Sequence, residues 1–321
     1  MLPVTKRCVI TVYRKKMCSK CFCSRRFLRR PNVSEACEQF TQPAKRLRSD
    51  EEPEYEALCQ LAVARCQQSG GQPLAEAEAT AEAARSFLKA ERAFTDVGCH
   101  TLEEQLVAAV HCYAHAVRIF DECGHRSRAG ALCVELADAL CDAGRVGQAI
   151  AFYERAADLR AGTVLEALHA KERAAACHID TGDYHSGLIA LTEVASVVES
   201  NGGRPLASVF ADIMARAEIQ RVLLLLLIEP TPQNISPSLT SVLDKYSWSS
   251  TVDESVAEET SQFLTEETFI LLQSIVMAVE VKDHEALLQL EEELAPQLET
   301  RPKTLLRRIV SNLQDKGRPG Q

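Results

Sequence analysis

The sequence predicts an all-α protein: a tetratricopeptide-like solenoid of helical hairpins, about a dozen helices in all, preceded by a disordered basic leader. Three observations favour this class. Apolar residues make up 46% of the 321 residues, which is enough to form a core. Gly and Pro contribute only 14 and 12 residues, and apolar positions recur at helical spacing without a convincing strand pattern. Small residues also flank one large residue at repeated intervals, as in packed helical hairpins.

The first predicted element is a basic leader, residues 1–48, with disorder expected up to about residue 24. It holds thirteen of the 36 Lys and Arg residues and two of the 45 acidic ones, a balance of +11 in a chain of net charge −9. Its "PAKRLRSDEE" stretch is either a nuclear-import signal (Lys45, Arg46, Arg48) or a basic helix surface. The rest of the chain is acidic, and we expect no nucleic-acid partner.

Residues 49–229 are predicted to form the helical array. In "CVELADALCDAGRVGQAIAFYERA", residues 133–156, a turn separates two amphipathic helices. We expect Tyr153 to pack against Leu136 and Leu140. The second helix presents the triplet Ala149/Tyr153/Ala156, which is echoed at Ala109/Tyr113/Ala116 and at Gly187/Leu191/Val194. These triplets lie 40 and 38 residues apart, farther than a strict 34-residue repeat. An irregular helical bundle is the alternative.

The array is predicted to end in an unusually apolar stretch, "EIQRVLLLLLIEP", residues 218–230. Seven apolar residues lie between Arg221 and Glu229, whereas a bilayer-spanning helix needs about 20. A helix that is apolar on every side is instead buried, either inside a large helical body or between two proteins.

Two segments follow the array. Residues 230–260 are predicted to be rich in loops, with one short helix around Leu243. Residues 261–321 are predicted to form C-terminal helices with an acidic face, on which Lys282 is the single Lys or Arg. That face comprises Glu280, Asp283, Glu285, Glu291, Glu292, Glu293 and Glu299.

No pattern in the sequence predicts an enzyme, a cofactor or a metal. The "CSKCFC" cluster (Cys18, Cys21, Cys23) lacks the second ligand pair of a structural zinc site. In "HCYAH", Cys112 stands between His111 and His115, where a zincin has glutamate. Phosphate-binding, nucleophile-elbow and dinucleotide motifs do not occur. The thirteen cysteines are scattered through Ala-rich helices, so we expect buried thiols in a reducing compartment.

Five blocks occur together in an order that resembles a known family. They are "RRFLRRPNVSEACEQF" (25–40), "CQLAVARCQQ" (59–68), "RVLLLLLIEP" (221–230), "DKYSW" (244–248) and "LLQSIVMAVE" (271–280). The sequence resembles the forty-kilodalton huntingtin-associated (factor VIII intron 22) protein family between about Arg25 and Glu293. The leader before Arg25 departs from that resemblance.

The resemblance implies a non-enzymatic scaffold that binds and stabilises huntingtin and is linked to early endosomes through a Rab-family small GTPase. We expect a cytoplasmic protein with early-endosome association, and a second pool in the nucleus if the basic cluster at Lys45, Arg46 and Arg48 is an import signal. The predicted partner contacts are Tyr246, Trp248, Glu291, Glu292 and Glu293, with apolar burial at "DKYSW" and "RVLLLLL" supplying most of the binding energy. The alternative is a trafficking adaptor similar to the soluble NSF attachment proteins, acting without huntingtin.

Overall fold

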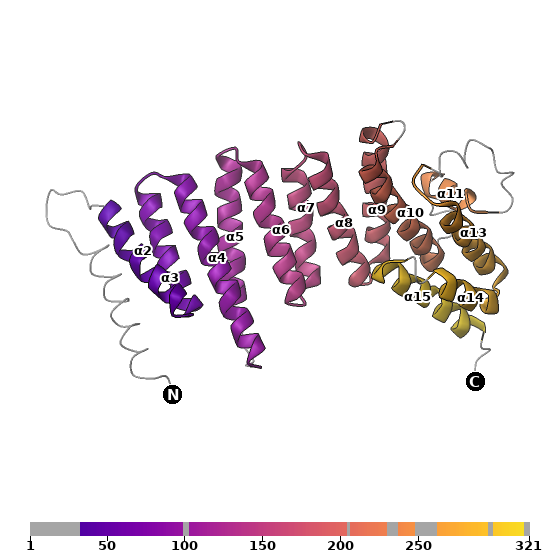
Figure 1. The fold of residues 1–321 in the computed structure, drawn as a ribbon, viewed down its shortest axis with the longest axis horizontal. Helices are drawn as coiled ribbons and strands as arrows, with labels where there is room; N and C mark the ends of the chain where they lie inside the picture. The colour runs from indigo at the N-terminus through magenta and orange to yellow at the C-terminus, as the bar shows by residue number, and fades with distance from the viewer. Residues whose placement is uncertain are drawn as a thin grey trace. The chain divides into compact units, whose positions relative to one another are not determined.

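The computed structural model describes residues 33–98, 103–203, 206–229, 237–247, 262–294 and 298–317. Within these ranges the regular structure is entirely helical, which confirms the predicted fold class (Figure 1). The described ranges contain thirteen helices, against about a dozen expected. The "CSKCFC" cluster and the segment predicted to be disordered lie outside the described residues.

The chain divides into two compact units, whose boundary lies between Ala139 and Leu140. The helices of the first unit are α2 (Val33–Ser49), α3 (Pro53–Ser69), α4 (Pro73–Asp96), α5 (Glu104–Glu122) and most of α6 (Arg126–Asp142). The second unit holds the end of α6, then α7 (Val146–Leu159), α8 (Val164–Asp180), α9 (Tyr184–Asn201), α10 (Ser208–Ile228), α11 (Pro237–Asp244), α13 (Glu266–Val281), α14 (His284–Leu294) and α15 (Thr300–Gly317).

Local sequence signals account for several helix boundaries. Pro53 and Pro73 stand at the first positions of α3 and α4, where the missing N–H costs no intrahelical bond. Gly144 and Gly182 follow α6 and α8 with φ of 73° and 83°, a left-handed conformation that favours glycine. These glycines let the chain turn directly into the next helix.

The repeated triplets all lie in the core, as predicted. On α5, Ala109, Tyr113 and Ala116 are fully buried, and the same holds for Ala149, Tyr153 and Ala156 on α7. Their counterparts on α9, Gly187, Leu191 and Val194, are also buried. Burial of the small residues allows close helix packing around one large side chain in each triplet.

The last part of the basic leader, from Val33 onward, is helical and belongs to the folded body. Helix α2 includes the predicted import signal and packs on α3, with Ala44 buried. Arg48 Nε donates to Glu56 Oε1 at 2.6 Å and Arg48 Nη2 to Glu82 Oε2 at 3.0 Å. The structure therefore places the segment of the predicted import signal in the first unit, because these ion pairs and Ala44 join it to the neighbouring helices.

A second charge cluster in the first unit links three helices. Arg85 donates to both carboxylate oxygens of Glu135, at 2.7 and 2.9 Å, and the Tyr113 hydroxyl donates to Glu135 Oε1 at 2.8 Å. Burial alone would raise the pKa of Glu135, but the hydrogen bonds from Arg85 and Tyr113 and the charge of Arg85 outweigh it. The pKa of Glu135 is therefore lowered.

The leucine-rich helix α10 belongs to the core of the second unit. Residues Val222 to Leu226 are each at most 7% exposed, because α9, α13 and α15 pack around α10. Even the polar end of the run is covered: Arg221 Nη1 lies 2.9 Å from Glu218 Oε2, and both side chains are buried. Val222 to Leu226 are therefore core residues of the chain, whereas Leu227 and Ile228 are only partly buried. That this run supplies binding energy to a partner stays a prediction.

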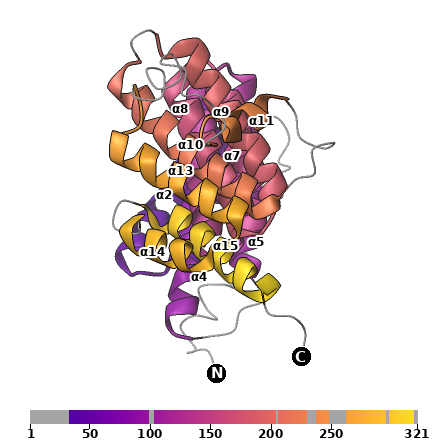
Figure 2. The ribbon, with the colours of Figure 1, turned by 90° about the vertical axis from the view of Figure 1, so that its right-hand side faces the viewer.

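The C-terminal helices complete this core. Helix α13 packs on α10 and α14, and α15 packs on both α14 and α10 (Figure 2). Leu305, Leu306, Ile309 and Val310 of α15 join the same apolar cluster as the leucines of α10. The short helix α11 includes Leu243, within the segment predicted to be rich in loops. No helix in the described part of the chain is long and apolar enough to cross a membrane.

Candidate interaction site

Of the two aromatic residues predicted to contact a partner, Tyr246 and Trp248, the structure describes only Tyr246. Tyr246 is fully buried and packs on Phe269, with ring centroids 5.3 Å apart. Burial and the nearby Glu218 charge raise the pKa of Tyr246, so its hydroxyl stays protonated. Trp248 lies outside the described residues. The structure thus gives Tyr246 a role in the chain's own core, and its contact with a partner stays a prediction.

The three predicted acidic contacts lie on α14 but are not equivalent. Glu292 and Glu293 are exposed, and neither forms an ion pair with another described residue. Glu291 is mostly covered, and its Oε1 accepts a hydrogen bond from Arg307 Nε of α15 at 3.0 Å. Only two of the three carboxylates are therefore available to meet a partner's positive charge.

The outer side of α14 combines acidic and apolar side chains. Leu287 and Leu294 point into the core, while Glu285, Leu288 and Glu292 are exposed. The spacing of these three residues, i, i+3 and i+7, places them on one side of the helix. We call Glu285, Leu288, Glu292 and Glu293 the α14 face. A 41%-exposed leucine bordered by carboxylates has the composition of a partner contact with a charged rim.

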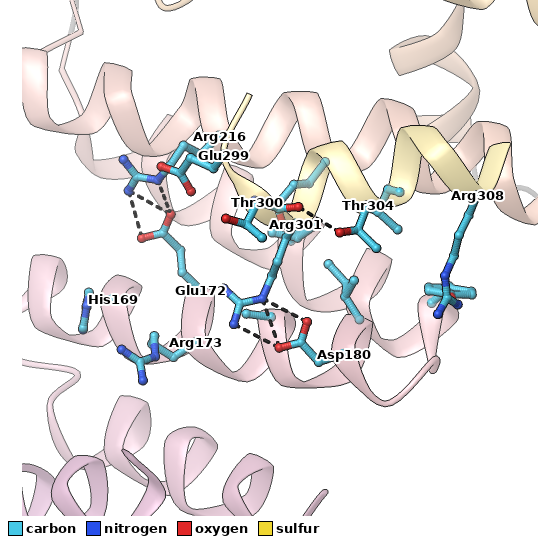
Figure 3. Close-up of a pocket in the computed structure, with 16 residues that line it drawn as sticks. His169, Glu172, Arg173, Asp180, Arg216, Glu299, Thr300, Arg301, Thr304 and Arg308 are labelled. Atoms are coloured by element: carbon cyan, nitrogen blue, oxygen red, sulfur yellow. Dashed lines mark hydrogen bonds and ion pairs between the residues drawn. The ribbon is translucent and has the colours of Figure 1, made fainter. Parts of the chain in front are cut away.

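A cleft of about 880 Å³ lies in the second unit, lined by α8, α9, α10 and the beginning of α15 (Figure 3). Arg301 of α15 donates three hydrogen bonds of 3.0–3.1 Å to the carboxylate of Asp180 on α8. Arg308 of α15 donates to the hydroxyl of Tyr184 and lies over its ring. These contacts join α15 to α8 and α9 along the cleft. We call this set of contacts the α8–α15 seam.

Opposite charges occupy most of this cleft. Arg216 of α10 donates to both oxygens of Glu172 on α8, at 2.9 to 3.2 Å. Burial raises the pKa of Glu172, and the charge and hydrogen bonds of Arg216 offset this only in part, while Glu299 adds to the rise. The cleft lining contains no cysteine or serine nucleophile. The ion pairs of this cleft therefore join α10 and α15 to α8.

The other residues singled out for chemistry are also dispersed. Within the described ranges, no group of three or more His, Cys, Asp or Glu side chains could hold a metal ion. His111 is exposed, while His115 Nε2 lies 2.9 Å from Glu76 Oε1. Five of the eight described cysteines are buried, in line with the expectation of thiols that act as small apolar residues.

Two mammalian relatives decide the family. The chain is 36% identical over 338 aligned positions to the 40-kDa huntingtin-associated protein of Mus musculus, and 37% identical to that of Rattus norvegicus. Each alignment covers 89% of this chain and 88% of the relative.

The chain belongs to the 40-kDa huntingtin-associated protein family.

This member of the 40-kDa huntingtin-associated protein family also resembles a second family. Residues 14–202 match the sequence model of the family described as soluble NSF attachment protein, SNAP. That family has a fold of helical hairpins, which agrees with the helical array observed here.

Sequence patterns alone missed the α8–α15 seam and the engagement of Glu291. Arg301 and Asp180 are separated by 121 positions, and Arg307 and Glu291 by 16. The helical phase of α15, which brings Leu305, Leu306, Ile309 and Val310 to the core, predicts that Arg301 and Arg308 lie on its other sides. It does not predict which helix they meet, because pairing between distant charges leaves no local pattern.

Proposed function

We propose that this chain is a non-enzymatic interaction subunit that binds and stabilises huntingtin and links it to early-endosome trafficking. The supporting observation is the extent of the similarity to two proteins whose names state an association with huntingtin. Those alignments cover 89% of the chain, whereas the SNAP match ends at residue 202. The huntingtin-associated relatives therefore account for C-terminal helices that the SNAP likeness leaves out.

The α14 face is the part of the surface that best fits the proposed contact. Exposed carboxylates at Glu292 and Glu293 favour a basic partner surface, where complementary charge mainly sets orientation and encounter rate. Leu288 would occupy an apolar recess in that surface and slow dissociation. Huntingtin is the proposed occupant, and its contacting surface is expected to carry Lys or Arg around an apolar recess.

The cellular part of the proposal is supported by the family resemblance alone. It comprises a cytoplasmic location, recruitment to early endosomes, and a Rab-family small GTPase as a further partner. A nuclear pool has weaker support, because Arg48 of the basic segment is engaged in two ion pairs and leaves Lys45 and Arg46. Endosomal recruitment that persists after removal of the Rab protein would contradict the GTPase link.

A kinetic experiment tests the α14 face. Glu292→Lys with Glu293→Lys should slow association with purified huntingtin by roughly tenfold at low salt and flatten its dependence on ionic strength. The matched control is Glu38→Lys with Glu199→Lys, which makes the same charge change at two other exposed glutamates. Leu288→Ala should instead speed dissociation, as should Trp248→Ala.

The control pair defines the result that would contradict this proposal. If the α14 double variant and the control pair change the association rate equally, only net charge matters and the face is a solubilising surface. Glu291 is left unchanged because its reversal would also break the ion pair with Arg307 and confuse the two effects.

The alternative function is that of an adaptor similar to the soluble NSF attachment proteins, favoured by the match over residues 14–202. It predicts productive binding of the purified chain to assembled SNARE bundles without huntingtin. A pull-down with SNARE bundles, in the presence and absence of huntingtin, separates the two functions. Saturable SNARE binding with no huntingtin binding would replace our proposal by this one.

A further inference from the structure

Two thiols of the second unit lie in contact, although they are 36 positions apart in the sequence. Cys141, in the last turn of α6, has its Sγ 3.7 Å from Sγ of Cys177 on α8. Both cysteines are free thiols in this structure. A disulfide bond has a sulfur–sulfur distance of about 2.05 Å, so the two side chains together would need to close by about 1.7 Å. A helix end such as that of α6 adjusts more easily than a helix interior.

The two thiols differ in access, which sets the order in which they would react. Cys177 is 3% exposed, whereas Cys141 is partly exposed and can meet a small oxidant. Burial, followed by the neighbouring thiol of Cys141, raises the pKa of Cys177. Cys141 is therefore the thiol that reacts first with the oxidant. Cys177, which lies in the core, then reacts with the oxidised Cys141.

A polar group beside Cys141 favours its reaction. The Tyr153 oxygen lies 3.9 Å from Cys141 Sγ, and Arg173 donates a hydrogen bond of 2.8 Å to the same oxygen. The guanidinium of Arg173 also lies 5.2 Å from the centre of the Tyr153 ring. A hydroxyl polarised by an arginine can donate to the sulfur as negative charge develops there.

We propose that Cys141 and Cys177 form a peroxide-sensitive dithiol that closes to an intramolecular disulfide between α6 and α8. In the first step the Cys141 sulfur attacks one oxygen of hydrogen peroxide, the O–O bond breaks, and a sulfenic acid and one water form. In the second step the Cys177 sulfur attacks the sulfenic sulfur, the S–O bond breaks, and the disulfide and a second water form. The two thiols are oxidised by two electrons and the peroxide is reduced; a thiol reductant reverses the change.

The second step is favoured by position rather than by intrinsic reactivity. Cys177 is already at contact distance, so its attack is intramolecular and gains a high effective concentration. The disulfide would close a loop that contains all of α7, including the buried Tyr153.

The test uses the full chain, reduced and then treated with hydrogen peroxide. Remaining thiols are blocked with N-ethylmaleimide, and the peptides are mapped by mass spectrometry without reduction. We expect a peptide in which Cys141 is joined to Cys177, with the loss of two hydrogens, and its disappearance after dithiothreitol. Cys141→Ala should abolish this peptide. Cys123→Ser, which removes an exposed thiol of the first unit, should leave it unchanged.

A second variant keeps the inference testable if the loss of Cys141 perturbs folding. In Cys177→Ser the sulfenic acid at Cys141 should persist and be trapped by dimedone, because no second thiol can displace it. The inference is overturned if Cys141 and Cys177 remain fully reactive to maleimide after unfolding while Cys123 has been oxidised. It is equally overturned if Cys141 is trapped as sulfenic acid in the unaltered chain and no joined peptide forms.

Discussion

Truncation of Leu224 to alanine should destabilise the second unit by about 3–4 kcal/mol. Leu224 is fully buried within the cluster formed by α9, α10, α13 and α15. The substitution removes three carbon atoms, worth about 2.4 kcal/mol at roughly 0.8 kcal/mol for each buried methylene group. A cavity that closes only in part adds to this cost, and measured Leu→Ala changes in helical cores span about 2.7–5.0 kcal/mol.

Urea unfolding of the full chain, followed by circular dichroism, measures this change. The control is Ile189→Ala on α9 in the same unit, because Ile189 is 52% exposed and should change stability by no more than about 0.5 kcal/mol. The decisive quantity is the difference between the two variants. If Leu224→Ala costs no more than Ile189→Ala, the leucine run is not the core helix that the structure describes.

Three further predictions address individual contacts. Tyr153→Phe keeps the buried ring but removes the acceptor for Arg173, and should cost about 1.5 kcal/mol in urea unfolding; a neutral result would show that this hydrogen bond contributes nothing. Arg301→Ala breaks an exposed ion pair with Asp180 and should cost at most about 1 kcal/mol, less at high salt, as thermal melts at two ionic strengths would show. The pKa of Glu135 is lowered from its ordinary 4.5, so its contribution to stability is present above that value and is lost as pH falls through the folded-state pKa. Glu135→Gln should therefore weaken the loss of stability below pH 4.5 in acid titrations, and an unchanged acid profile would contradict the lowered pKa.

Helical periodicity was enough to predict the fold because it depends only on the spacing of apolar residues that are close together in the sequence. The triplets around Tyr113, Tyr153 and Leu191 combine small and large residues one turn apart, and each lies in the core. The length of the Val222–Ile228 run and its polar ends argued against a membrane span. They could not decide between a core and a partner surface, because burial on all sides has the same composition in both cases.

Partner contacts were harder to predict because they depend on pairing between distant segments. Glu291 resembles Glu292 and Glu293 in sequence, yet only Glu291 meets Arg307. Tyr246 is of a residue type that is enriched at protein interfaces, but α10 and α13 bury it within the chain. Similarly, the contact between Cys141 and Cys177 joins two helices separated by α7, and neither cysteine has a sequence context that indicates the other.

The central claim, that the chain is an interaction subunit that forms a stable complex with huntingtin, is tested most directly by assembly. The tagged full chain would be expressed with and without huntingtin, and each preparation analysed by size-exclusion chromatography with light scattering. We predict one stoichiometric complex peak in the co-expressed sample and a poorer yield of soluble chain without its partner. An equally soluble, stable chain that elutes apart from huntingtin in both samples would contradict the claim.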